Sequence, residues 1–204
     1  MRRNRLIIGF FLRLVVLYGL LIAPWPGLDR AYLACFRAAG NTLFGTFHSA
    51  GSVRFVEDPH PSVKWPTRMI YRKRGARGEG RGRYDTRQGY LATALAMALI
   101  AATPVPWSRR WKALFWGFLL ANGFVALRVY LGLLDLYSEA DPVALFHFNP
   151  FWKRALGLVV RITTVSPEFT FVVPVFIWVI VTLRRRDFER WRDGGARGTP
   201  APGR

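Results

Sequence analysis

Four long apolar stretches, each bordered by basic residues, constrain the fold of this chain more than any other feature. They lie at residues 6–24, 90–106, 111–134 and 167–183. The hydrocarbon core of a bilayer is about 30 Å thick, and a helix needs about 20 apolar residues to cross it. Each stretch is close to that length, so the pattern predicts four transmembrane helices.

The charge balance indicates what lies between the apolar stretches. The 204 residues include 30 Lys and Arg but only 12 Asp and Glu, which gives a formal net charge of +18. Hydrophobic residues make up 51% of the chain, which excludes a disordered polycation, because such chains are too poor in apolar residues to form a core. We therefore expect a membrane protein with basic loops, and no nucleic-acid partner.

The orientation prediction rests on three basic clusters next to the apolar stretches: Arg2, Arg3 and Arg5; Arg109, Arg110 and Lys112; and Arg184, Arg185 and Arg186. In a four-helix arrangement all three clusters fall on one side of the membrane. Basic residues near the ends of membrane helices favour the cytoplasmic side. The sequence thus predicts a multi-pass protein of the bacterial inner membrane with both termini in the cytoplasm.

The segments between the apolar stretches have shorter patterns of their own. Two amphipathic surface helices are predicted at 28–39 and 151–162, and alternating sequences predict three short strands at 52–56, 67–72 and 83–86. The predicted fold class is an all-α membrane protein with four transmembrane helices, two amphipathic surface helices and a small extracytoplasmic β-element. It divides into an anchor helix (1–24), an extracytoplasmic segment (25–89), a three-helix membrane region (90–183) and a basic disordered tail (184–204).

Basic residues are concentrated around a glycine-rich stretch at 75–82, which we predict to be a flexible connection between two strands. The candidate anion-binding residues there are Arg72, Lys73, Arg74, Arg77, Arg81 and Arg83. Such a surface is suited to the anionic headgroups of a bilayer, or to glycans. A sheet this small is not stable alone and should rest on the helices or on another protein. We also expect another membrane protein or an exported protein as a partner.

Residues that hold metals or cofactors are scarce. His48, His60 and His147 are the only histidines, and none has a second ligand at helical spacing. Cys35 is the only cysteine, which excludes an internal disulfide and any site with several thiolates. We predict no metal and no cofactor.

Cys35 is also the one candidate nucleophile, on the apolar side of the helix predicted at 28–39. A lone cysteine there is most often a small hydrophobic residue. A catalytic thiolate would instead need a positive neighbour and a base, for which Arg128 and His147 lie on the same predicted side. Arg128 falls inside an apolar stretch, where an arginine either reaches the headgroups, packs against partners or has a function.

The chain order Cys35, Asn122, Arg128, His147 resembles that of the exosortase/archaeosortase group of membrane cysteine transpeptidases. The most similar part runs from Arg109 to Arg128, 20 of 204 residues, whereas the residues that follow Cys35 and His147 depart from the family pattern. The resemblance implies processing of exported proteins, with Cys35 as nucleophile, His147 as base and Arg128 stabilising an oxyanion.

Two functions remain open from the sequence. The first is an accessory or scaffold protein of the bacterial envelope, without enzymatic activity, that supports export or sorting of surface proteins. The second is a divergent exosortase-like cysteine transpeptidase or protease. A single observation separates them, because only the second requires the chemistry of Cys35.

Overall fold

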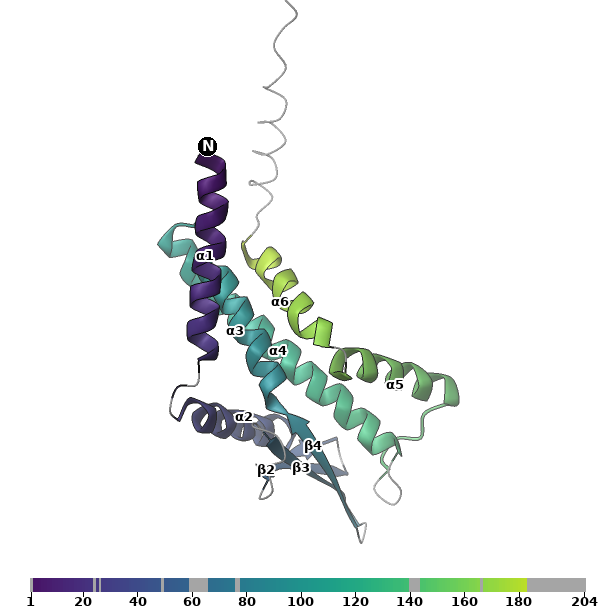
Figure 1. Ribbon diagram of the computed structural model, residues 1–204. Coiled ribbons are helices and arrows are strands. Elements are labelled where there is room, and N and C mark those ends of the chain that lie inside the picture. The colour runs from purple at the N-terminus through teal and green to yellow at the C-terminus, as the bar shows by residue number, and fades with distance from the viewer. Residues whose placement is uncertain are drawn as a thin grey trace, which may run out of the picture.

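The computed structural model describes residues 2–23, 25, 27–48, 50–58, 66–75, 78–139, 144–165 and 167–182. In chain order the elements are α1 (Arg2–Ile22), α2 (Leu28–Phe44), β1 (Thr46–Phe47), β2 (Gly51–Glu57), β3 (Pro66–Lys73), β4 (Glu79–Asp85), α3 (Thr86–Ala102), α4 (Trp107–Glu139), α5 (Pro150–Val165) and α6 (Pro167–Thr182). The helices α1, α3, α4 and α6 run side by side, and the sheet lies with α2 at one end of them (Figure 1).

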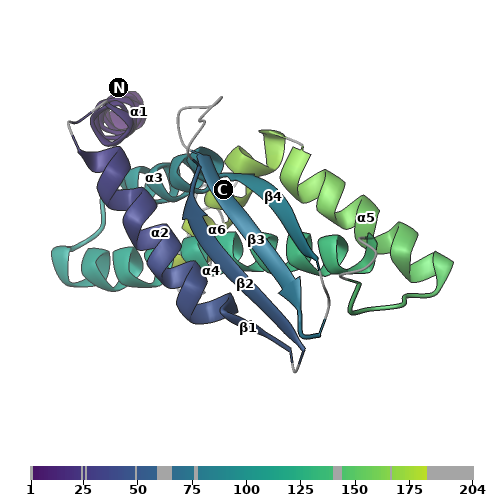
Figure 2. The same cartoon turned by 90° about the horizontal axis from the view of Figure 1, so that it is seen from below.

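The sheet is antiparallel with the order β1-β2-β3-β4. Its strands alternate between an apolar and a polar face, as the period of two requires. Val53 and Phe55 on β2, Met69 and Tyr71 on β3 and Tyr84 on β4 are all buried on the inner face. Seen from below, the sheet lies in front of α3 and α4, so its outer face points away from the helices (Figure 2).

The C-terminal half of α4 packs against the inner face of this sheet. Val129, Leu133 and Tyr137 belong to the same buried cluster as the inner-face residues of the strands. The Tyr137 hydroxyl donates to the carbonyl of Ser52 at 2.9 Å and also reaches that of Arg72 at 3.3 Å. The long helix α4 thus connects the sheet to the helical part of the protein.

Helix α2 packs along the sheet, and the side chain of Asn41 connects the two through a pair of hydrogen bonds. The Asn41 amide nitrogen donates to the Phe55 carbonyl at 3.2 Å, and its oxygen accepts from the Phe55 N–H at 2.7 Å. Gly40 makes the close approach feasible, because a Cβ there would lie 2.8 Å from Cδ2 of Phe55. Asn41 therefore supplies the hydrogen bonds that a further strand would otherwise give to this part of β2.

The structure shows that the prediction of four transmembrane helices is wrong. Within the described residues, only α4 has a stretch long and apolar enough to cross a bilayer, at Trp107–Ser138. The apolar stretches of α1 (Ile7–Ile22) and α6 (Phe169–Thr182) are about 24 and 21 Å long at 1.5 Å per residue, short of the ~30 Å hydrocarbon core. Helix α3 is the central helix of the protein, with ten of its 17 residues buried.

The all-α class is wrong as well, because a four-stranded sheet joins six helices in the described part of the chain, which makes the protein mixed α/β. The strands predicted at 52–56 and 67–72 are confirmed as parts of β2 and β3. The predicted loop at 75–82 is wrong from Glu79 onward, where β4 begins. The predicted disordered tail, 184–204, lies outside the described residues.

Candidate functional site

The outer face of the sheet is rich in arginine. Five arginines from three strands project from it: Arg54, Arg68, Arg72, Arg81 and Arg83. The register places Arg68 opposite Arg83 and Ile70 opposite Arg81, while Arg54 faces Ile70 from the other side. Like charges directly opposite each other repel, so this face needs carboxylates to be stable.

Two carboxylates bridge the arginines. Asp58, whose side chain is only 1% exposed, lies 2.6 Å from Arg68 and 2.9 Å from Arg83. Glu79 lies 3.0 Å from Arg72 and 2.8 Å from Arg81. Five arginines against these two carboxylates leave a charge of +3 on the face, and a hollow of about 320 Å³ opens between Arg68, Arg81 and Arg83.

Hydrogen bonds to Arg81 and Arg72 also change the acidity of Glu79. They favour the ionised carboxylate and lower the pKa of Glu79 below its ordinary value. The carboxylate therefore stays charged in mildly acidic solution and keeps both arginines in place on the face.

The structure describes five of the six predicted anion-binding residues. Arg72, Arg81 and Arg83 lie on the outer face, Lys73 donates to the carbonyl of Ala144 at 2.7 Å, and Arg74 is exposed in the turn that follows β3. Arg77 lies outside the described residues. Lys73 thus connects the sheet to the segment after α4 instead of joining the arginine face.

A large apolar cavity lies beneath α2. It has a volume of about 730 Å³, is open on one side, and is lined by α2, α3, α4 and Phe55 of β2, with Leu21 at the end of α1. The polar side chains that line it include Tyr32, Thr93 and Asn122. Burial raises the pKa of the Tyr32 hydroxyl above its ordinary value, because the charged phenolate is poorly solvated there.

Cys35 is exposed and lines this cavity together with Tyr32 and Ala39. The three residues share one side of α2, as the helical spacing predicts. The surroundings of the thiol are mostly aliphatic and aromatic side chains. A small apolar residue suits such a wall.

Arg128 is buried in α4 and does not line the cavity. Its Nη2 donates to Oε1 of Gln88 at 2.9 Å, and its guanidinium lies 5.9 Å from the ring centroid of Phe124. Only 2% of the residue is exposed, so it does not extend toward headgroups. The hydrogen bond connects α4 to the first turn of α3, whereas Phe124 lies one turn earlier on α4 itself.

His147 is exposed in the segment between α4 and α5. Phe146 of this segment packs against Phe47 and His48, which follow the C-terminal end of α2. Of the three residues predicted for cysteine catalysis, the cavity wall holds Cys35 alone. The structure therefore offers the thiol an apolar pocket, but it brings neither the candidate base nor the candidate oxyanion donor to that wall.

Metal ligands do not gather anywhere in the described part of the chain, where three or more His, Cys, Asp or Glu side chains never form a group. No protein-family model, curated protein or solved structure matches the chain. The resemblance to the exosortase/archaeosortase group stays a prediction.

The six candidate anion-binding residues do not include Arg54 and Arg68, which also lie on the arginine face, or the buried Asp58. The signal was present in the alternation of small or apolar residues with arginine, as in Gly80, Arg81, Gly82 and Arg83. In the strand this alternation places the glycines on the inner face and the arginines on the outer one. A glycine-rich stretch is more often a loop than a strand, which explains the error.

Proposed function

We propose that the protein is an accessory or scaffold protein of the bacterial envelope, held in the inner membrane by its helices, whose arginine face binds an acidic segment of an exported or membrane protein. The observation that supports the proposal is that the arginine face and the exposed apolar surface of the helices lie on different parts of the protein. A sheet with an arginine-rich outer face stands at one end of helices whose outward side chains are large and apolar.

Exposed apolar residues cover three helices. On α1, α4 and α6 they include Ile7, Ile8, Phe11, Leu12, Val15, Val16, Trp111, Phe115, Trp116, Phe118, Leu119, Phe171, Val175, Phe176 and Ile180. Contiguous apolar surface of this size is rare on soluble monomers and is expected where lipid covers the protein. In this proposal α4 crosses the hydrocarbon core and the shorter apolar stretches lie beside it.

The direction of insertion follows from the ends of the helices. The N-terminal end of α1, the first turn of α4 and the C-terminal end of α6 lie at one end of the molecule, opposite the sheet (Figure 1). Arg109, Arg110 and Lys112 mark that end as cytoplasmic. The proposal keeps the cytoplasmic side expected from the sequence for both ends of the chain, and it places the sheet outside.

The arginine face favours a protein partner over the headgroups of the protein's own membrane. It points away from the helices (Figure 2), and therefore away from the bilayer that would surround them. Arginine binds carboxylates with two parallel hydrogen bonds, which suits an acidic peptide segment.

Two measurements on the full chain test the proposal. In a Cys35→Ala background, a cysteine at Arg74 should react with a membrane-impermeant maleimide on intact spheroplasts, and one at Ser108 only after permeabilisation. In nanodiscs, a polyglutamate peptide should bind less tightly as salt rises, and the variant Arg54→Gln/Arg81→Gln should weaken binding several-fold, whereas Lys153→Gln/Arg154→Gln should not. Labelling of both cysteines from one side, or salt-independent binding, would refute it.

One observation favours the second function, a cysteine transpeptidase or protease. Cys35 is exposed at the wall of a cavity large enough for an apolar side chain of a substrate peptide. If Cys35 is the nucleophile, the candidate base His147 and the candidate oxyanion donor Arg128 come close to the thiol only when a substrate is bound. Substitution of Cys35 distinguishes the two functions, because only the enzyme requires the thiol.

A further inference from the structure

We propose that the hollow between α4 and α6 binds one anionic phospholipid, with the phosphate between Arg109 and Lys112 and an acyl chain against Trp116, Leu120 and Ile180. The inference rests on the proposed membrane insertion and assigns a specific ligand to the cytoplasmic end of the protein. This site lies at the opposite end of the molecule from the arginine face.

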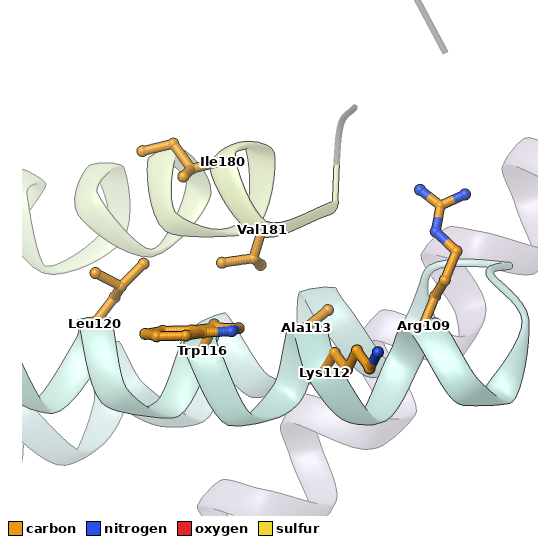
Figure 3. A pocket seen from close by; sticks show the side chains of 7 residues that line it. All are labelled: Arg109, Lys112, Ala113, Trp116, Leu120, Ile180 and Val181. Atoms are coloured by element: carbon orange, nitrogen blue, oxygen red, sulfur yellow. The ribbon is translucent and has the colours of Figure 1, made fainter. Parts of the chain in front are cut away.

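The hollow has the shape and chemistry of a lipid site. Its volume is about 380 Å³, and its lining divides into a basic end and an apolar end. Figure 3 shows Arg109 and Lys112 at the same end of the groove, with Arg109 extending away from α4 and Lys112 lying along it, and the ring of Trp116 below Val181. Leu120 and Ile180 continue the groove away from the cations (Figure 3).

The start of α4 concentrates positive charge. The helix begins at Trp107 and has no acidic residue in its first turn, while Arg109, Arg110 and Lys112 lie within its first six residues. The N-terminal end of a helix also carries about half a positive charge from the aligned peptide dipoles. Cations at this end are unfavourable by themselves, so an anion between them would be stabilised by both the side chains and the helix.

The groove extends from the basic end along α4, far enough for the part of an acyl chain next to the headgroup. Lys112 and Leu120 are eight residues apart, which corresponds to about 12 Å along the helix axis. Trp107 and Trp111 are exposed next to the cations, as expected for aromatic side chains at the headgroup level. Basic pockets between membrane helices on the cytoplasmic side are typical binding sites for anionic headgroups. A free phosphate would satisfy only the basic end.

Two basic residues at the start of α5 supply a matched control. Lys153 and Arg154 are exposed in the first turns of α5, and their replacement by glutamate changes the net charge by the same amount as replacement of Arg109 and Lys112. They lie outside the hollow. General attraction to an anionic surface would be reduced equally by both pairs of substitutions, but a specific site would not.

The test uses the full chain in nanodiscs or mixed micelles, with binding measured by titration of phosphatidylglycerol against phosphatidylcholine. The parent should prefer phosphatidylglycerol, the variant Arg109→Glu/Lys112→Glu should bind it at least tenfold more weakly, and Lys153→Glu/Arg154→Glu should bind like the parent. Arg109→Lys/Lys112→Arg retains both charges and should keep the preference. Glycerol phosphate alone should bind far more weakly than the lipid.

If the glutamate variant does not accumulate, Arg109→Gln/Lys112→Gln provides the same comparison with a smaller change in charge. No lipid preference in the parent, or an equal loss in the α5 control, would overturn the inference. Equal affinity for glycerol phosphate would show a phosphate site in place of a lipid site. Resistance of the parent to alkaline extraction from membranes is measured in parallel, because its loss would refute the proposed function separately.

Discussion

Gly80 lies so close to the ring of Tyr71 that a Cβ on Gly80 would stand 2.1 Å from Cε2 of the tyrosine. The two residues are paired across β3 and β4, and the Tyr71 ring covers the position that a side chain on β4 would take. Tyr71 is buried and packs edge-to-face on Tyr137 at 5.3 Å. The glycine is therefore required for the tyrosine to connect the sheet to α4.

This contact predicts the effect of a single added methyl group. Gly80→Ala should push Tyr71 out of the inner face and destabilise the protein by about 1–3 kcal/mol, the usual cost of overpacking a core. Gly132→Ala is the control, since nothing lies within 4 Å of a Cβ at that position of α4. Thermal unfolding in detergent should show a lower Tm for the first variant and an unchanged or higher Tm for the second.

The buried carboxylate between two arginines gives a second prediction. Asp58→Asn should destabilise the sheet by about 1–3 kcal/mol, because Arg68 and Arg83 lose the charge that holds them together. Glu57→Gln removes the same charge from a neighbouring residue whose side chain is 81% exposed, and it should change stability by no more than about 0.5 kcal/mol. Equal Tm shifts in the two variants would contradict a structural role for Asp58.

The lowered pKa of Glu79 predicts how this corner of the sheet responds to acid. A carboxyl whose pKa is lower in the folded state stabilises the fold above its unfolded pKa, and the contribution is lost as pH falls through the folded value. The parent should therefore lose stability below about pH 4.5 more steeply than Glu79→Gln, which has no proton to bind. Chemical denaturation at pH 7 and at pH 3.5 measures the difference, and parallel curves would argue against it.

The contact of Arg128 with Gln88 predicts that lysine is a poor substitute. Arg128→Lys keeps the charge but loses the planar guanidinium that reaches Gln88 and lies near Phe124, so we expect a loss of about 1–3 kcal/mol. Arg13→Lys is the control, since Arg13 is exposed on α1. A double-mutant cycle with Gln88→Ala should give a coupling of at least ~0.5 kcal/mol. A coupling of zero would mean that the hydrogen bond contributes nothing to stability.

Substitutions of Cys35 distinguish the scaffold function from the transpeptidase function. As a wall residue of the cavity it should tolerate both Cys35→Ala and Cys35→Ser, with each variant accumulating normally and complementing a deletion strain. A nucleophile would lose activity in both variants at unchanged protein level, because a serine hydroxyl is far less acidic than a thiol. The second result would reject the scaffold function and favour the transpeptidase.

Local patterns in the sequence were enough to place most of the secondary structure. Helical periodicity placed α2 and α5, and alternation placed β2 and β3, because each depends on residues that are neighbours in sequence. The length and apolarity of α4 could be read in the same way. The shared side of Tyr32, Cys35 and Ala39 also followed directly from their spacing on one helix.

Only the tertiary structure decided what covers each apolar surface. An Ala-rich stretch such as α3 has the same composition whether lipid or protein surrounds it, and the packing of α1, α4 and α6 around it determines which. Likewise, Gly80 reads as part of a loop until Tyr71 is known to occupy the space above it. Arg128 and Gln88 are 40 residues apart, and no local pattern predicts that they meet. Burial and pairing between distant segments depend on the three-dimensional path of the chain, and for that reason the sequence alone could not show them.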